Sequence, residues 1–337
     1  WHQFRHACNN SMRKARVAGA TKIGRLAAPR LSMRRGDTQG FAYAVLTLTA
    51  FLFACNHIIG RAVHGEVPPV GLSFWRWVVG ILVLLPFVLR HGLERWPIYR
   101  RHWPAFALLG FFMIGSTTLV LVALSMTSAI NVSLINAMQP TLTVLFAWLF
   151  FRQALNARRT VGIVCGAVGV AVMVSRADLA VFTGLDFQPG DFVALLAMCG
   201  FSGFALNLHR LPRELSDVES LFAITVAGTS MLMPFYLVES IVWKPVPVST
   251  TSIGAILALA LLVSVFGNLM WNAGNRMIGP ARAAIFINLI PVFGAVLAML
   301  FLDERLYLYH LAGGALVGLG LYLAAVARRA ASPDGDA

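Results

Sequence analysis

Two sets of polar side chains recur at helical spacing inside otherwise apolar stretches of this chain, and the chemistry they offer is the binding of a polar solute. The sets are Asn136, Gln139 and Thr143 in one stretch and Ser264, Asn268, Asn272 and Asn275 in the other. Spacings of three and four residues place each set on one face of a helix. Amides that faced lipid would lack hydrogen-bond partners, so we expect both faces to point at other helices or at water. Together with Asn288, they are the candidate lining of a central cavity.

Arg76 lies seven residues into a predicted helix over residues 69–90, which is ~11 Å from the helix end at ~1.5 Å per residue. A charge at that depth snorkels to the membrane surface, bonds to backbone carbonyls or binds an anionic group of the solute. The matching position in the second half of the chain is the apolar Ile224, and this asymmetry favours a specific role. A carboxylate would suit the planar fork of the guanidinium.

Asn56, His57, Asn207 and Trp271 complete the candidates for contact with a solute. Asn56 and His57 fall in the first predicted helix, and Asn207 falls at the matching level of the sixth. The two asparagines either join helices by hydrogen bonds or form part of a gate. His57 either packs or binds solute, and Trp271, beside Asn272, either packs or stacks on the solute.

Pro140 and Pro291 each lie within a predicted membrane helix. A proline there removes a backbone hydrogen bond and kinks the helix. The kink either only shapes the helix or also frees carbonyls for the solute, and we expect a combined structural and gating role.

The groups that covalent chemistry needs are missing from the predicted helices. There is no HExxH motif and no pair of intramembrane aspartates, and the four cysteines are scattered, so we expect neither an enzyme nor a metal or cofactor site. The 14 acidic residues all fall in tails, loops or helix ends. Proton-coupled transporters commonly use buried carboxylates or histidines, so we predict an uncoupled facilitator, with His57 as the one candidate proton carrier.

The composition is that of a polytopic membrane protein. Of 337 residues, 58% are apolar and only 12% charged, against roughly 25% charged in soluble domains. The net charge of +13 would suggest nucleic acid on a soluble chain, but here the basic residues lie in tails and loops, so no nucleic-acid partner is expected. A membrane helix needs ~20 mostly apolar residues, and an all-α fold of ten such helices is predicted at 41–63, 69–90, 104–126, 130–151, 159–176, 191–211, 218–240, 253–275, 279–301 and 308–327.

Basic residues predict the orientation. With both termini in the cytoplasm, most of the 27 Lys and Arg fall in cytoplasmic loops and tails, as the positive-inside rule requires. The residues left on the outer side are Arg61, Arg176, Lys244 and Arg305. Residues 1–39 are basic and nearly free of acids, so we expect a disordered cytoplasmic tail outside the fold, with a transit peptide or a leader foreign to the protein as alternatives. Residues 329–337 form a second tail.

The chain repeats itself. A shift of 151 residues aligns Asn56 with Asn207 and Pro140 with Pro291. We therefore predict two five-helix repeats, over 40–176 and 190–328. Because five is odd, the second repeat enters the membrane from the opposite side, and such inverted repeats are typical of secondary transporters with a solute site near the midplane.

These features resemble the drug/metabolite transporter superfamily, in particular its EamA-type repeats. The resemblance rests on the 5+5 plan, the Pro140-containing fourth helix, Arg76, and the passage from Pro291 through Phe301-Leu302-Asp303-Glu304-Arg305-Leu306 to Gly313, Gly314, Gly318 and Gly320. The first half departs from it, with Arg152-Gln153 where the second half has Asp303-Glu304. Within the superfamily the resemblance is closest to bacterial amino-acid and metabolite exporters, which implies export of small metabolites, most of all amino acids, across the inner membrane by alternating access.

Other functions are also compatible with this sequence. The superfamily also includes carriers of drugs, nucleosides and sugars, and polar stripes that joined into a pore would make a solute channel, although the chain shows no ring of charge for ion selectivity. Gly162–Gly166 and Gly314–Gly318 in the fifth and tenth helices have the GxxxG spacing of close helix contacts. They pack either within a monomer or between the subunits of a homodimer.

Overall fold

A computed structural model describes residues 35–89, 92–152, 157–175, 188–279, 283 and 286–329 of the chain. Its contacts divide the chain into Trp1–Phe41 and Ala42–Ala337. In the first unit only residues 35–41 are described, and they form the beginning of helix α2. The second unit holds all the features discussed below.

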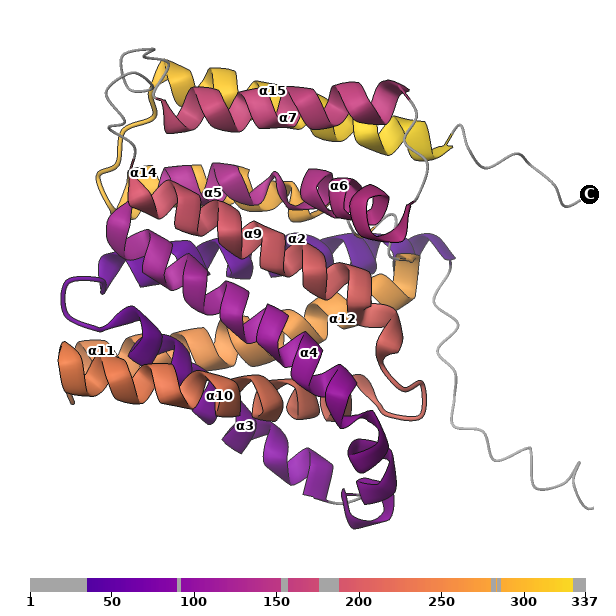
Figure 1. The fold of residues 1–337 in the computed structure, drawn as a ribbon, viewed down its shortest axis with the longest axis vertical. Coiled ribbons are helices and arrows are strands. Elements are labelled where there is room, and N and C mark those ends of the chain that lie inside the picture. The colour runs from indigo at the N-terminus through magenta and orange to yellow at the C-terminus, as the bar shows by residue number, and fades with distance from the viewer. Residues whose placement is uncertain are drawn as a thin grey trace, which may run out of the picture. The chain divides into compact units, whose positions relative to one another are not determined.

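Every regular element of the described residues is helical (Figure 1). The first half of the chain contains α2 (Arg35–Ala62), α3 (Pro69–Leu89), α4 (Gly92–Met126), α5 (Ala129–Asn136), α6 (Gln139–Phe151) and α7 (Ala157–Val174). The second half contains α9 (Pro189–Asn207), the 3₁₀ turn η1 (Leu208–Arg210), α10 (Asp217–Val242), α11 (Thr250–Ala258), the π-helix η2 (Leu259–Gly267), α12 (Asn268–Ile278), α14 (Leu289–Phe301) and α15 (Leu308–Arg329). The predicted all-α membrane fold is confirmed.

The predicted number of ten spans is not fully reached. By length and hydropathy, six described helices are able to cross a membrane, or seven if α5 and α6 form one bent span. Three further apolar helices are shorter, within Thr160–Met173, Leu289–Phe301 and Leu308–Gly320. Part of the predicted ninth helix, over 279–301, lies outside the described residues.

Both predicted proline kinks coincide with breaks in a helix. The axes of α5 and α6 differ by 44°, and Pro140 is the second residue of α6. Pro291 lies in the first turn of α14, which begins after Asn288. The chain therefore breaks just before each proline, because a proline fits the first turn of a helix, where its missing N–H leaves no carbonyl unpaired.

Helices α7 and α15 pack side by side along their length (Figure 1), and glycines allow their backbones to touch. A Cβ added to Gly169 would lie 2.7 Å from the carbonyl oxygen of Gly313, and one added to Gly320 would lie 2.8 Å from the backbone nitrogen of Gly166. The predicted pair Gly314–Gly318 does not form this contact, since a Cβ on Gly318 meets nothing within 4 Å. The close approach is thus intramolecular and uses Gly313 and Gly320.

This contact predicts that alanine substitutions at two glycines of the α7–α15 pair have very different effects on stability. Gly169→Ala forces a methyl group against backbone atoms that are unable to rotate away, and overpacking of this kind costs about 1–3 kcal/mol. Gly318→Ala adds the same methyl group to open space. Thermal unfolding of the purified protein in detergent should show a lower midpoint for Gly169→Ala and an unchanged one for Gly318→Ala. Equal midpoints for the two variants would contradict the packing.

Carboxylates of the second half bind the beginnings of two helices of the first half. Glu239 accepts hydrogen bonds from the backbone N–H groups of Val70 and Gly71, at 3.1 and 2.6 Å. Glu304 accepts from those of Ala129 and Ile130, at 2.8 and 2.9 Å. A negative charge is favourable at the N-terminus of a helix, so these helix-end acids hold α3 and α5 against the second half.

Asp191, in the first turn of α9, is only 2% exposed and ends a buried chain of hydrogen bonds. Its carboxylate accepts from the hydroxyl of Thr127 at 2.7 Å and from the Asn131 side-chain amide at 3.1 Å. The Nδ1 atom of His310 accepts from the Tyr307 N–H, so its Nε2–H donates to the Asn131 oxygen, at 2.9 Å. The position of Asp191 at a helix end agrees with the prediction from the sequence, but its burial was not predicted. The chain joins α5 of the first half to α9 and α15 of the second.

Candidate functional site

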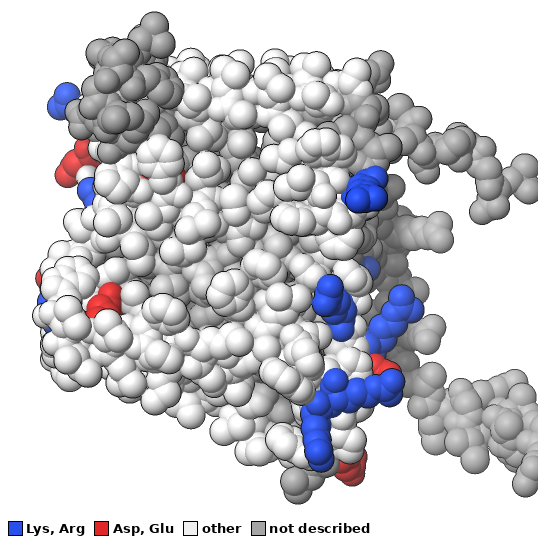
Figure 2. Space-filling model, viewed as in Figure 1, with Lys and Arg blue, Asp and Glu red and all other residues white. Residues whose placement is uncertain are grey.

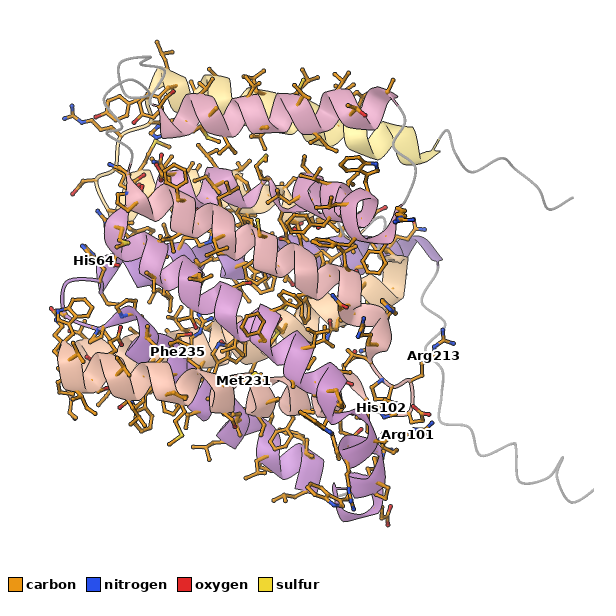
Figure 3. The ribbon with its side chains drawn as sticks, viewed as in Figure 1. His64, Arg101, His102, Arg213, Met231 and Phe235 are labelled. Carbon is orange, nitrogen blue, oxygen red and sulfur yellow. The ribbon has the colours of Figure 1, made fainter. Side chains whose placement is uncertain are left out.

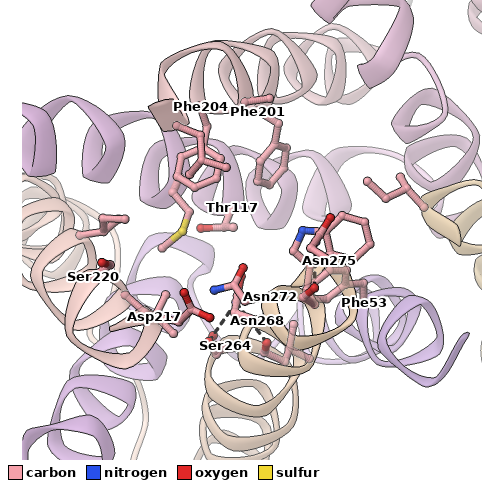
Figure 4. Close-up of a pocket in the computed structure, with 18 of the residues that line it drawn as sticks. Phe53, Thr117, Phe201, Phe204, Asp217, Ser220, Ser264, Asn268, Asn272 and Asn275 are labelled. Carbon is pink, nitrogen blue, oxygen red and sulfur yellow. Dashed lines mark hydrogen bonds between the residues drawn. The ribbon is translucent and has the colours of Figure 1, made fainter. Parts of the chain in front are cut away.

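A cavity of about 1010 Å³ lies between helices of both halves. Its wall includes residues of α2, α3, α4 and α6 from the first half and of α9, α10, η2 and α12 from the second (Figure 4). It brings together most of the polar residues singled out from the sequence: Asn56, His57, Arg76, Asn136, Gln139, Thr143, Ser264, Asn268, Trp271, Asn272 and Asn275. Residues from both halves thus share one polar chamber.

Arg76 lies at the buried end of this cavity and is 1% exposed, so its guanidinium does not snorkel to the surface. Its Nη1 donates a 2.6 Å hydrogen bond to the Asn56 side-chain oxygen, and its charge lies 5.1 Å from the ring centre of Trp77. Nε is buried without a hydrogen-bond partner, and no ion pair among the described residues involves Arg76. A buried charge without a counter-ion is costly, so the site favours a ligand that carries a negative group.

His57, the next residue of α2, also lines the cavity and is only 3% exposed. Its Nδ1 lies 2.7 Å from the Ser133 hydroxyl, which holds the ring in one orientation. Ser133 belongs to α5, so this bond links α2 to the broken helix of the first half. His57 is thus packed against α5, and it also lines the cavity; its contact with solute stays a prediction.

One wall of the cavity is formed by η2 and α12, which contribute Ser264, Asn268, Asn272 and Asn275. The Asn268 amide donates to the backbone oxygens of Ser264, at 2.9 Å, and Val263, at 3.3 Å, and these bonds are visible in Figure 4. Asn275 likewise donates to the Trp271 oxygen at 2.8 Å. π-Helical turns inside α-helices are frequent at functional sites, and here the turn supplies Val263 and Ser264 to the lining and leads directly into the lining residues of α12.

Other amides of the wall are free to bind a solute. The side chains of Asn136, Gln139 and Asn272 make no hydrogen bond within the described part of the chain. The Ser264 hydroxyl is also buried without a partner. Phe53, Phe201 and Phe204 add aromatic surface around these groups (Figure 4). Neutral donors and acceptors among aromatic rings suit a small solute with both polar and apolar parts.

The opposite end of the cavity is charged and exposed. Its lining there includes Arg213 and the ion pair between Arg276 of α12 and Asp217 of α10. In Figure 2 the blue Lys and Arg side chains gather at the right of the view, the side where Figure 3 places Arg213 and Arg101. The cavity therefore leads from this basic end of the protein to the enclosed Arg76.

Four residues singled out from the sequence lie outside the lining. Asn207 ends α9 and donates to the Gly203 backbone oxygen at 2.8 Å. Asn288 directly precedes α14, and its side-chain oxygen is buried without a partner. Pro140 and Pro291 lie at the helix breaks, next to the lining residues Gln139 and Ile290.

Several residues of the lining were not predicted from the sequence. Thr117, Phe201, Phe204 and Asp217 line the cavity but were not distinguished from other residues of apolar helices or helix ends. Phe201 and Phe204 are three residues apart and therefore share a helix face, which is the one available signal.

The comparisons with known proteins agree with this architecture. The EamA-like transporter family matches residues 40–175 and 188–326. The Bacillus subtilis protein described as "Uncharacterized transporter YyaM" is 24% identical over 265 residues, 77% of this chain and 85% of the relative. A "Probable amino-acid metabolite efflux pump" of Salmonella typhimurium is 22% identical over 289 residues, 82% of this chain and 92% of the relative.

A protein of known crystal structure has a similar fold. It is 20% identical, with a TM-score of 0.53, and the alignment covers 85% of this chain and 98% of that protein. Since the family match extends over both halves of the chain, this multi-pass membrane protein is a transporter of the EamA-like family.

Proposed function

We propose that this protein is a secondary carrier that moves small polar metabolites, most of all amino acids, across the cytoplasmic membrane. The observation that carries the proposal is a cavity between the two halves that is enclosed at Arg76 and exposed at its basic end. Such a cavity corresponds to one state of an alternating-access carrier. By the positive-inside rule the basic end faces the cytoplasm, so the cavity belongs to the inward-facing state.

Three features support an amino acid as the solute. Arg76 lacks a counter-ion and would receive the carboxylate, which suits its fork geometry. The free amides of Asn136, Gln139 and Asn272 would bind the ammonium group through their oxygens. Trp271, Phe201 and Phe204 would surround the side chain. The name of the Salmonella relative points the same way.

We propose further that transport is uncoupled, because no acidic residue is found in the enclosed part of the described cavity. Asp217, the carboxylate among the lining residues, pairs with Arg276 at the exposed end. The buried Asp191 and His310 are not part of the lining. Solutes would then follow their own gradient, so export reflects a higher concentration inside the cell.

The alternative solutes are drugs, nucleosides and sugars. A buried cation opposes the binding of cationic drugs, whereas neutral nucleosides and sugars would leave the charge of Arg76 without a counter-ion. A channel is the alternative of a different class. The enclosure of Arg76, Asn56 and His57 at one end favours a carrier, since a channel needs a path that is open at both ends.

Counterflow tests the proposal directly. Proteoliposomes of the purified protein, loaded with unlabelled amino acid, should accumulate the radiolabelled amino acid transiently and saturably. The panel comprises aromatic, aliphatic and hydroxyl side chains, and each solute is measured with and without a pH gradient. We expect exchange that the gradient does not change.

Three other outcomes of these measurements would each contradict one part of the proposal. Accumulation driven by the pH gradient would overturn the uncoupled mechanism but not the substrate. Exchange of nucleosides or sugars in the absence of any amino-acid exchange would overturn the substrate. Single-channel currents in a planar bilayer would overturn the carrier.

A further inference from the structure

Helix α4 extends beyond the length that a membrane requires. It runs from Gly92 to Met126, 35 residues, which at ~1.5 Å per residue is ~50 Å, against a hydrocarbon core of ~30 Å. The sequence predicted a membrane helix only from residue 104. Its first three turns therefore project into the level of the lipid headgroups, at the basic end of the protein where Figure 3 shows Arg101 and His102.

One face of this projecting segment carries an arginine between two tryptophans. Trp96, Arg100 and Trp103 are spaced by four and three residues, so their side chains lie on the same side of the helix. Both tryptophans are 64% exposed, and Arg100 is exposed as well. Large aromatic side chains exposed to this degree are typical of contact with lipid at the membrane interface.

The packing of α4 fixes this face outward. Arg95, on another side of the same turn, donates a 2.5 Å hydrogen bond to the buried carboxylate of Glu219 and a second one, at 3.2 Å, to the Glu214 backbone oxygen. These bonds hold the segment against the beginning of α10. Arg95 is thus occupied by the protein, whereas Arg100 has no hydrogen-bond or ion-pair partner within the described residues.

The same face continues into the membrane. Phe111, eight residues beyond Trp103, again falls on this side of α4, and it is 60% exposed. An apolar surface thus begins at Trp103 and runs towards the membrane centre, with the arginine at its headgroup end. A molecule that fits such a surface has an anionic group at one end and a long apolar chain at the other.

We propose that Trp96, Arg100 and Trp103 form a binding site for an anionic phospholipid. The Arg100 guanidinium donates hydrogen bonds to the phosphate, and the two indole rings pack on either side of the headgroup. An acyl chain lies along α4 towards Phe111. The neighbouring Arg101, Arg213 and the other basic residues visible in Figure 2 attract anionic lipid to this end of the protein.

The test measures lipid binding and not transport, so it is independent of the proposed function. Purified protein in detergent is titrated with phosphatidylglycerol or phosphatidylcholine, and bound lipid is counted by native mass spectrometry. We expect phosphatidylglycerol to bind more tightly, and Arg100→Gln to weaken that binding about fivefold, as for the loss of one basic contact at an anionic membrane surface.

Arg101→Gln is the matched control, because it removes the same charge from the next residue of the same helix. It should weaken phosphatidylglycerol binding much less than Arg100→Gln does. Trp96→Leu combined with Trp103→Leu keeps every charge and should also reduce the binding. Equal losses in Arg100→Gln and Arg101→Gln, or equal affinity of the unaltered protein for the two lipids, would overturn the site. Competition by inorganic phosphate as strong as by the lipid would likewise overturn it.

Discussion

Arg76→Gln is expected to raise the amino-acid concentration that half-saturates counterflow at least about 30-fold. Removal of one member of a buried, hydrogen-bonded charge pair costs ~2 kcal/mol or more, and the proposed pair consists of this guanidinium and the carboxylate of the solute. The Arg76→Lys variant retains the charge but loses the planar fork, so it should retain part of the activity. The measurement is the initial rate of counterflow across a range of solute concentrations in proteoliposomes.

The unfolding temperature of the Arg76→Gln variant distinguishes a solute-binding role of Arg76 from a purely structural one. Arg76 is a buried cation without a counter-ion in the described structure, so its removal relieves a desolvation cost and should leave the unfolding temperature unchanged or higher. Arg276→Gln, which removes a cation from the exposed end of the cavity, serves as a control with a much smaller effect on transport. Unchanged counterflow in Arg76→Gln would exclude a carboxylate site at this arginine.

The second large effect concerns the buried hydrogen-bond chain that ends at Asp191. Asp191→Ala removes the charged acceptor of two buried bonds, from the Thr127 hydroxyl and the Asn131 amide. The hydroxyl keeps Gln188 as an acceptor at 2.6 Å, and the amide keeps the Thr127 oxygen at 3.3 Å. The loss is therefore that of the two bonds to the carboxylate, and a hydrogen bond to a charged group contributes about 1.5–3 kcal/mol. We therefore expect a loss of about 3 kcal/mol in unfolding free energy, measured by thermal or denaturant unfolding in detergent.

Asp191→Asn provides the control for this prediction. Its side-chain oxygen still accepts a hydrogen bond from Asn131, so the loss of stability should be smaller than in Asp191→Ala. If transport is uncoupled, Asp191→Asn should also exchange amino acids at the same rate with and without a pH gradient. A wild-type dependence on the gradient that disappears in Asp191→Asn would assign proton coupling to this carboxylate.

The helices and the polar lining were predictable because both follow directly from spacing. Apolar runs of ~20 residues define membrane helices, and polar residues three or four positions apart must share a face. The structure places Asn268 and Asn272 together in the lining, as that argument requires. The bend before Pro140 follows from the chemistry of proline in the same way.

The limits of the sequence argument are clearest at Asn207 and Asp191. Repeat symmetry matched Asn207 with Asn56, but Asn56 is held by Arg76, and the position that matches Arg76 is Ile224. Without a cation to bind, Asn207 bonds to its own helix. Asp191 falls at a helix end, where a carboxylate is normally solvated. It is covered by Asn131 of α5, which is held in turn by His310 of α15, and no local pattern in the sequence reports these contacts.

The π-helix of residues 259–267 was also invisible to hydropathy, and it bears on the energetics of the transport cycle. In an inverted repeat with two identical halves, exchanging the conformations of the halves would give two access states of equal free energy. The corresponding helix of the first half, α4, is α-helical throughout, so the exchange is not symmetric here. In the proposed alternating-access cycle the two states would therefore differ in free energy, and each ~1.4 kcal/mol of difference changes their populations tenfold. For a carrier that follows gradients, this bias would leave the net direction unchanged but would make the apparent affinity for solute differ between the two sides of the membrane.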